Sequence, residues 1–166
     1  MVSPFNGWME CNTDGASQGN LGPSCFVVIF KNSHDEVVEC CYFPCRNATT
    51  LESEMNVFIR AVDMVYQNHW NNIWFECDLE VLVQAVWVNQ YHLSWKQNDK
   101  WIKCLERLSN MNQIVMNMFR EGNYIADGLS KNGILEERCM RLSIMPDDLM
   151  NFLIQDKCKI PSFHIV

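Results

Sequence analysis

The sequence predicts an α/β domain in which helices flank a mixed β-sheet. Two observations carry this prediction. The N-terminal quarter of the chain contains three strand-like runs in succession, and the rest alternates between segments with helical periodicity and short strand-like runs. Consecutive strands joined by turns pair antiparallel, whereas strands joined through helices add parallel neighbours. The expected sheet is therefore five-stranded and mixed.

The three N-terminal runs occupy residues 8–13, 25–30 and 36–43. They are rich in apolar and β-branched residues, which pack well in sheets. Residues 14–23 form a turn-rich stretch with three glycines, so we expect the first strand to end at Asp14. These runs predict a meander of three antiparallel strands.

The next segment has the pattern of a helix. From Thr50 to about Asn68 apolar residues recur at helical spacing, and Thr49 or Thr50 followed by Glu52 and Glu54 is typical of a helix start. Beyond it the pattern predicts, in order, a strand over residues 73–77, helices over 79–88 and 97–110, a strand over 113–119 and a helix over 123–133.

The 166 residues fit one domain, with a core at residues 8–133 and a helical tail at residues 134–166. No apolar run approaches the length of a membrane span, and no leader of the secretory type is present, so we expect an intracellular protein, nuclear or cytoplasmic, without a membrane partner. A monomer is the default expectation for its oligomeric state.

Nine cysteines would suggest disulfides in a small secreted domain, but the number is odd. Five of them lie within apolar, strand-like runs and are expected to be reduced core residues: Cys11, Cys25, Cys40, Cys41 and Cys77. The net charge of −7 is unfavourable for a free-standing protein that binds a polyanion. Bound metal ions, or attachment to a larger protein that supplies binding, would offset it.

Four acidic residues lie where strand or helix signals meet: Asp14, Glu54, Asp78 and Asp127. Each has an ordinary structural explanation. Asp14 could form a turn, Asp78 could cap a helix, and Asp127 lies in a first helical turn, where the helix dipole favours a carboxylate. Glu54 could likewise accept hydrogen bonds from the first turn of its own helix.

Glu54 gives the best independent argument for a functional carboxylate. On a helix it shares one face with Phe58, Ala61 and Val65, so an acid begins an otherwise apolar stripe. A carboxylate at the edge of a core needs a partner, because desolvating it unpaired is costly. A metal ion is one such partner.

The segments around the four acids are Asn12-Thr13-Asp14-Gly15-Ala16-Ser17, Leu51-Glu52-Ser53-Glu54, Phe75-Glu76-Cys77-Asp78 and Phe119-Arg120-Glu121-Gly122-Asn123-Tyr124-Ile125-Ala126-Asp127. In order and spacing they resemble the signature segments of type 1 ribonuclease H, especially the reverse-transcriptase-associated version from plant retroelements. The resemblance extends over residues 8–155 and implies a ribonuclease H-like fold.

The resemblance also implies a function. The four acids would be catalytic residues that bind two Mg²⁺ ions, with Mn²⁺ as a substitute. Asp14 would bridge both ions, Glu54 and Asp78 would complete one, and Asp127 would bind the other. Two such metals can activate a water and stabilise the leaving 3′ oxygen, so the implied reaction is hydrolysis of the RNA strand of an RNA/DNA hybrid.

Two groups of residues are candidates for binding the hybrid. The resemblance implies minor-groove contacts from the loop after the first aspartate, through Gly15, Ser17 and Asn20. The spacing of basic residues on the 97–110 helix suggests a phosphate track that consists of Lys96, Lys100, Lys103 and Arg107. A flexible hairpin and an ordinary solvated helix face remain the alternatives.

The chain departs from the family pattern at three positions. Many relatives carry a histidine ten residues before the last aspartate, where this chain has Asn117, which cannot titrate near neutral pH. Phe26 stands where relatives have a small residue and could crowd the sheet or the substrate surface. Leu21 replaces the usual proline of its turn.

Three functions are therefore considered. The first is a metal-dependent endoribonuclease acting on RNA/DNA hybrids, either free-standing or part of a retroelement polyprotein. The second is a catalytically weak or inactive nucleic-acid-binding or interaction domain that kept the fold, as Asn117, Phe26 and the net charge suggest. The third is another nuclease or transposase of the same fold superfamily, which the Asn12 to Pro23 loop disfavours.

Overall fold

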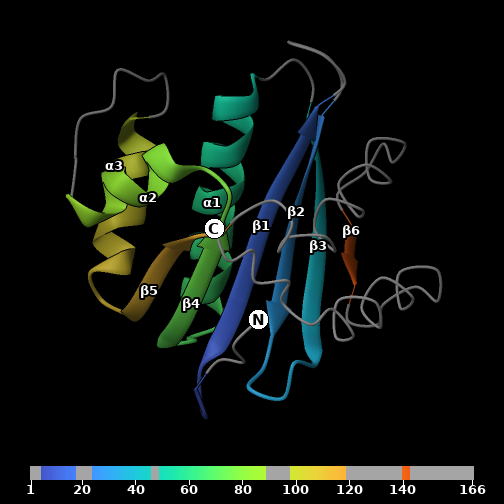
Figure 1. The fold of residues 1–166 in the computed structure, drawn as a ribbon, viewed down its shortest axis with the longest axis vertical. Helices are drawn as coiled ribbons and strands as arrows, with labels where there is room; N and C mark the ends of the chain where they lie inside the picture. The colour runs from blue at the N-terminus through green and yellow to red at the C-terminus, as the bar shows by residue number, and fades with distance from the viewer. Residues whose placement is uncertain (1–4, 18–23, 46–48, 89–97, 119–139, 143–166) are drawn as a thin grey trace, which may run out of the picture.

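The structure, a computed structural model, describes residues 5–17, 24–45, 49–88, 98–118 and 140–142 (Figure 1). Its strands are β1 (Met9–Ser17), β2 (Ser24–Lys31), β3 (Val37–Cys45), β4 (Asn72–Cys77), β5 (Asn112–Asn117) and β6 (Met140–Leu142). Its helices are α1 (Thr50–Gln67), α2 (Glu80–Trp87) and α3 (Asn98–Leu108). The helix predicted over residues 123–133 lies outside the described residues.

The strands form one mixed sheet in the order β5-β4-β1-β2-β3-β6. β2 pairs antiparallel with both β1 and β3, whereas β4 pairs parallel with both β1 and β5. This arrangement follows from the connections, because β1 to β3 are joined directly and β4 and β5 are each reached through helices. The predicted mixed sheet of five strands is confirmed.

The first strand is longer than predicted. β1 continues through Asp14 to Ser17, because its ladder with β2 runs from Glu10, opposite Lys31, to Ser17, opposite Ser24. The prediction that Asp14 ends the strand was therefore wrong. Pairing with β2 satisfies the backbone groups of a glycine-containing segment that would otherwise favour a turn.

β6 is an element that the sequence did not predict. Residues 140–142 were expected in a helical tail, but they pair antiparallel with Cys40, Cys41 and Tyr42 of β3. A run of three residues carries too little periodicity to be recognised, and an open sheet edge supplies the hydrogen-bonding groups that make it a strand. The rest of the tail, including the helix candidate at residues 147–155, lies outside the described residues.

Helix α1 begins with a capping box. The Thr49 side chain accepts a hydrogen bond from the Glu52 backbone N–H at 3.2 Å, and the Glu52 carboxylate accepts one from the Thr49 backbone N–H at 3.1 Å. Two otherwise unpaired donors are thereby satisfied. The predicted helix start is confirmed, and Thr49 is its cap.

The main core lies between α1 and the sheet, with α3 packed against α1 (Figure 1). Phe58 of α1 is fully buried between Phe75 of β4, with ring centroids 5.1 Å apart, and Trp101 of α3, 6.4 Å away. The cysteines predicted as reduced core residues are buried, as is Cys104, and none of them forms a disulfide within the described part of the chain. No helix within the described ranges is long and apolar enough to cross a membrane.

Candidate active site

Three of the four predicted acids come together at one point. Ligand oxygens of Asp14, Glu54 and Asp78 all lie within 4.8 Å of one another. Asp14 comes from β1, Glu54 from the second turn of α1, and Asp78 from the residue after β4. Asp127, the fourth, lies outside the described residues.

The sheet register explains the meeting of the two aspartates. Asn12 of β1 lies opposite Glu76 of the parallel strand β4, so Asp14 and Asp78, each two residues further on, reach the same level. The carboxyl ends of parallel strands are where α/β proteins gather functional residues. Glu54 then joins them because α1 packs across β1.

Neither helix uses these acids as its cap. The N-cap residue of α2 is Leu79, and that of α1 is Thr49. The structure thus assigns the N-cap of α2 to Leu79 rather than to Asp78, and the capping box of α1 to Thr49 and Glu52 rather than to Glu54. What remains to be explained is why three carboxylates converge.

The cluster is electrostatically costly without a cation. Asp14 is only 5% exposed and Glu54 only 3%, while Asp78 is half-buried. Like charges held this close repel, and the burial of Asp14 and Glu54 strengthens the repulsion because little water screens it. Carboxylate oxygens are the ligands that Mg²⁺ and Mn²⁺ prefer, so this donor set fits a hard divalent cation.

Cys77, next to Asp78, is not one of the residues whose ligand atoms converge in the described part of the chain. Burial, followed by the nearby charges of Glu54 and Asp78, raises the pKa of the Cys77 thiol to about 12. The thiol is therefore neutral in the metal-free protein, and the ligand atoms that converge are all carboxylate oxygens.

Sequence reasoning missed a buried polar group further back along β1 from Asp14. The Glu10 carboxylate lies 3.4 Å from the Lys31 ammonium on the neighbouring strand and accepts a hydrogen bond from the Asn12 side-chain amide at 2.5 Å. All three residues are at most 4% exposed. The signal was available in the polar residues 10, 12 and 14, which alternate along the strand with period two.

The predicted hybrid-binding residues are differently placed. Lys100 and Lys103 are exposed on α3, opposite its buried face. Arg107 instead contacts α1, where its guanidinium pairs with Asp63 and lies 4.8 Å from the ring centroid of Tyr66. Gly15 and Ser17 lie in β1, whereas Asn20 and Lys96 fall outside the described residues.

Two of the three departures from the family pattern can be placed. Asn117 ends β5 in register with Cys77, one residue from Asp78, and its side chain is exposed. Phe26 is 5% exposed and belongs to the core. The core has absorbed this larger side chain, so it does not project onto an outer surface. Leu21 lies outside the described residues.

Comparisons with known proteins agree with this geometry. The sequence matches the reverse transcriptase-like family over residues 12–133. No curated protein matches it significantly. RNase H1 from the halophilic archaeon Halobacterium salinarum is 18% identical, with a TM-score of 0.66, and the alignment covers 76% of this chain and 97% of that one.

Two further structures were solved in complex with an RNA/DNA hybrid. LC11-RNase H1, isolated from compost by a metagenomic approach, is 19% identical with a TM-score of 0.66, covering 76% of this chain and 96% of that one. Foamy viral protease-reverse transcriptase is 15% identical with a TM-score of 0.62, covering 77% of this chain and 20% of that one. At these identities the structural likeness establishes the fold alone. Because the family match spans most of the sequence, the chain belongs to the reverse transcriptase-like family, with a ribonuclease H-like fold.

Proposed function

We propose that this protein is a metal-dependent endoribonuclease that hydrolyses the RNA strand of RNA/DNA hybrids. The convergence of Asp14, Glu54 and Asp78 is the observation that carries the proposal. A cluster of buried carboxylates has a cost in stability that a purely structural role would not require. The fold and the family match support the same class of activity.

Each residue has a proposed role in this reaction. Asp14, with oxygens near both other acids, would bridge two Mg²⁺ ions, Glu54 and Asp78 would complete one ion, and Asp127 would bind the second. When bound, two such ions supply an activated water and stabilise the leaving 3′ oxygen, giving 5′-phosphate and 3′-hydroxyl products. The protein's own contribution is to hold the carboxylates in fixed positions on β1, β4 and α1.

Binding of the hybrid would use other residues. Exposed Lys100 and Lys103 would contact phosphates, together with Lys96, and the backbone and side chains at Gly15, Ser17 and Asn20 would contact the minor groove. The low density of positive charge supports a domain that acts within, or next to, a larger protein such as a retroelement polyprotein. A plant retroelement as the source is part of this proposal.

A second candidate function is a nucleic-acid-binding or interaction domain with little or no catalysis. Asn117 favours it, because an exposed amide at this place beside the cluster cannot exchange a proton near neutral pH. The burial of Phe26 removes one of the arguments for it.

The decisive test is cleavage of a labelled RNA/DNA hybrid in Mg²⁺ and in Mn²⁺, beside duplex DNA and duplex RNA. Asp14→Asn should abolish cutting, because it removes the bridging carboxylate while keeping the shape of the side chain. Glu36→Gln, the corresponding acid-to-amide change at an exposed site between β2 and β3, is the matched control and should cut like wild type. A folded wild-type protein that cuts nothing in either metal would leave the binding domain as the function.

A further inference from the structure

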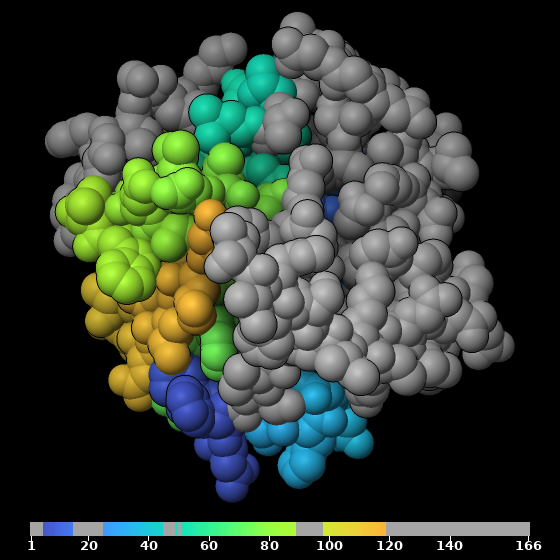
Figure 2. Space-filling view, viewed as in Figure 1, coloured from blue at the N-terminus to red at the C-terminus, as the bar shows by residue number. Residues whose placement is uncertain are grey.

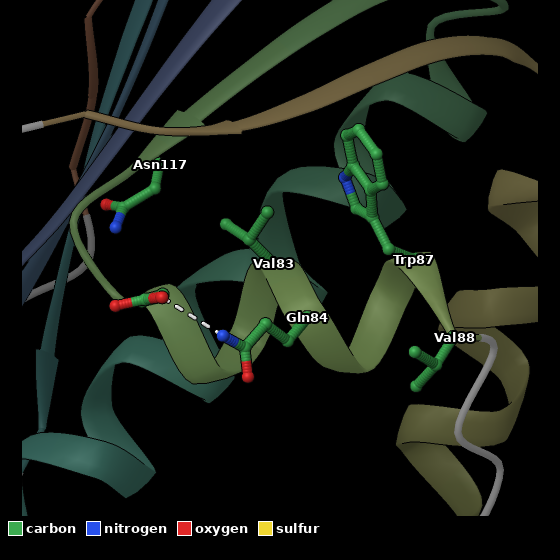
Figure 3. Close-up of a pocket in the computed structure, with 6 residues that line it drawn as sticks. Val83, Gln84, Trp87, Val88 and Asn117 are labelled. Carbon is green, nitrogen blue, oxygen red and sulfur yellow. Dashed lines mark hydrogen bonds between the residues drawn. The ribbon is translucent and has the colours of Figure 1, made fainter.

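A pocket lies beside the acidic cluster, between α2 and the end of β5 (Figure 3). Its volume is about 460 Å³, and its lining consists of Glu80, Val83, Gln84, Trp87, Val88 and Asn117. Glu80 is the second residue after Asp78, and Asn117 is in register with Cys77. The pocket therefore opens at the same strand ends as the cluster.

The pocket is an accessible part of the molecular surface. Figure 2 shows α2, in green, meeting the orange end of β5 on the outer face. Trp87 is 75% exposed and Val88 69% exposed. Large apolar side chains that are exposed next to one another, rather than singly, often mark a contact site for a ligand.

Trp87 is held in place in spite of its exposure. Its indole Nε1–H donates a hydrogen bond of 3.0 Å to the backbone carbonyl of Val115 in β5, the outermost of the described strands on this side of the sheet. Figure 3 shows Trp87 and Val83 projecting from α2 towards that strand. An aromatic ring fixed in advance loses little conformational entropy when a ligand stacks on it.

The polar groups that line the pocket determine which kind of ligand it can bind. The Glu80 carboxylate accepts a hydrogen bond from the Gln84 amide at 3.0 Å, and none of the described lining residues is cationic. With Asp78 close by, a phosphate would be repelled. A neutral, planar group with N–H donors meets the Trp87 ring, a carboxylate acceptor at Glu80 and an amide at Asn117 that can donate and accept.

We propose that this pocket binds the base of an unpaired nucleotide next to the hybrid, stacked on Trp87 and hydrogen-bonded to Glu80. The inference rests on the proposed function, because it places a nucleic acid at the neighbouring cluster. Guanine fits best, since its N1–H and N2–H donors lie on one edge, whereas uracil presents one donor between two acceptors. Aromatic stacking of single bases is common in proteins that bind single strands.

The test is binding of a labelled hybrid by fluorescence anisotropy in EDTA, where no divalent ion supports cutting. Four hybrids are compared: one with blunt ends and three with a single-nucleotide overhang that is guanosine, uridine or abasic. The overhang is placed in turn at each end of the strand. The guanosine overhang should bind about 5- to 100-fold more tightly than the blunt form. The uridine overhang should increase the affinity by less, and the abasic overhang should leave the affinity equal to that of the blunt hybrid.

Variants connect this gain to the pocket. Trp87→Ala should remove it, Trp87→Phe should retain part of it, and Glu80→Gln should reduce the preference for guanosine over uridine. Val81→Ala is the matched control, because Val81 is 59% exposed on the same helix but does not line the pocket. Should Trp87→Ala fail to fold, the Glu80→Gln comparison still decides the question.

Several results would overturn the inference: equal binding of blunt and overhanging forms, an abasic gain equal to that of guanosine, or a gain that persists in folded Trp87→Ala. Cleavage of the blunt hybrid in Mg²⁺, measured with the same protein, tests the nuclease separately. If the protein cuts the hybrid but its affinity does not depend on the overhanging base, the base-binding proposal fails and the nuclease proposal stands. A base-dependent gain without cutting rejects the nuclease and supports the pocket as a binding site.

Discussion

Asn117 is the residue whose chemistry most limits the proposed reaction. It is exposed at the end of β5, one register step from Asp78, and its amide neither gains nor loses a proton near neutral pH. A histidine at this position would titrate in that range. The proposed enzyme should therefore be slow, with its rate set by the metal site alone.

We predict that Asn117→His raises the cleavage rate of the hybrid roughly tenfold or more, because general acid–base assistance is typically worth at least that much. The pH–rate profile should gain a new limb near pH ~6.5, the ordinary pKa of histidine. Asn117→Gln serves as the control and should stay close to wild type. An unchanged rate and profile in Asn117→His would show that this position takes no part in proton transfer.

Buried thiols give a second prediction for single residues. Burial raises the pKa of Cys40 from its ordinary 9.0 to about 12, although a hydrogen bond with Tyr42 lowers it in part, and burial also raises the pKa of Cys104. The unfolded chain therefore releases these protons at lower pH than the folded one does. Their contribution to stability is complete below pH 9 and is lost as the pH rises towards 12.

The free energy of unfolding should accordingly fall above pH 9, by up to about 1.4 kcal/mol per pH unit for each thiol. Urea unfolding at a series of alkaline pH values measures this. Cys104→Ala should show a shallower decline than wild type, even though its stability near neutral pH is lower. Parallel profiles for the two proteins would mean that Cys104 does not contribute.

Among the elements, α3 has one face that packs in the core and one face that carries exposed basic residues. Trp101, Leu105 and Leu108 are buried at the spacing of one helix face, and Lys100 and Lys103 are exposed. The spacing alone also placed Arg107 with the lysines. Tertiary packing directs it towards α1 instead, where Asp63 and Tyr66 receive its guanidinium.

We predict that the basic residues of α3 separate into two classes. Arg107→Ala should lower the free energy of unfolding by about 1 kcal/mol, the sum expected for a partly exposed ion pair and a cation–π contact. Lys100→Ala and Lys103→Ala should leave stability nearly unchanged but weaken hybrid binding and reduce its salt dependence. Denaturation and anisotropy titrations on the same variants distinguish these effects. Stable lysine variants with unaltered binding would remove α3 from the hybrid interface.

At the scale of the whole molecule, negative charge is the dominant electrostatic feature. The chain has a net charge of −7, and three of its carboxylates are concentrated in one partly buried cluster. Self-repulsion of this kind destabilises the folded state, and a bound cation relieves it. Stability should therefore depend on divalent metal even when no nucleic acid is present.

We expect Mg²⁺ to raise the melting temperature of the wild-type protein, with a stabilisation of about 2.7 kcal/mol at a concentration 100 times the dissociation constant. Glu54→Gln should be at least as stable as wild type in EDTA, because it removes one repelling charge, and it should gain much less from Mg²⁺. Calorimetry with and without metal measures both effects. A melting temperature that Mg²⁺ does not change would contradict a metal site.

The sequence by itself determined most of the described elements, β6 excepted, and it singled out the acids that converge in the structure. Helical periodicity over residues 50–68, strand-like runs before and after it, and four motif-bearing acids were readable because each depends on neighbouring residues. Local signals also gave the capping box of α1, since its partners Thr49 and Glu52 are three residues apart.

Only the tertiary structure decided which side chains meet. Pairing with β2 extended β1 through Asp14, parallel register brought Asp78 level with it, and packing of α1 added Glu54. The Arg107 contact and the Trp87 pocket likewise join segments far apart in the chain. Such contacts depend on long-range packing free energy, which outweighs local preferences and leaves no periodic trace in the sequence.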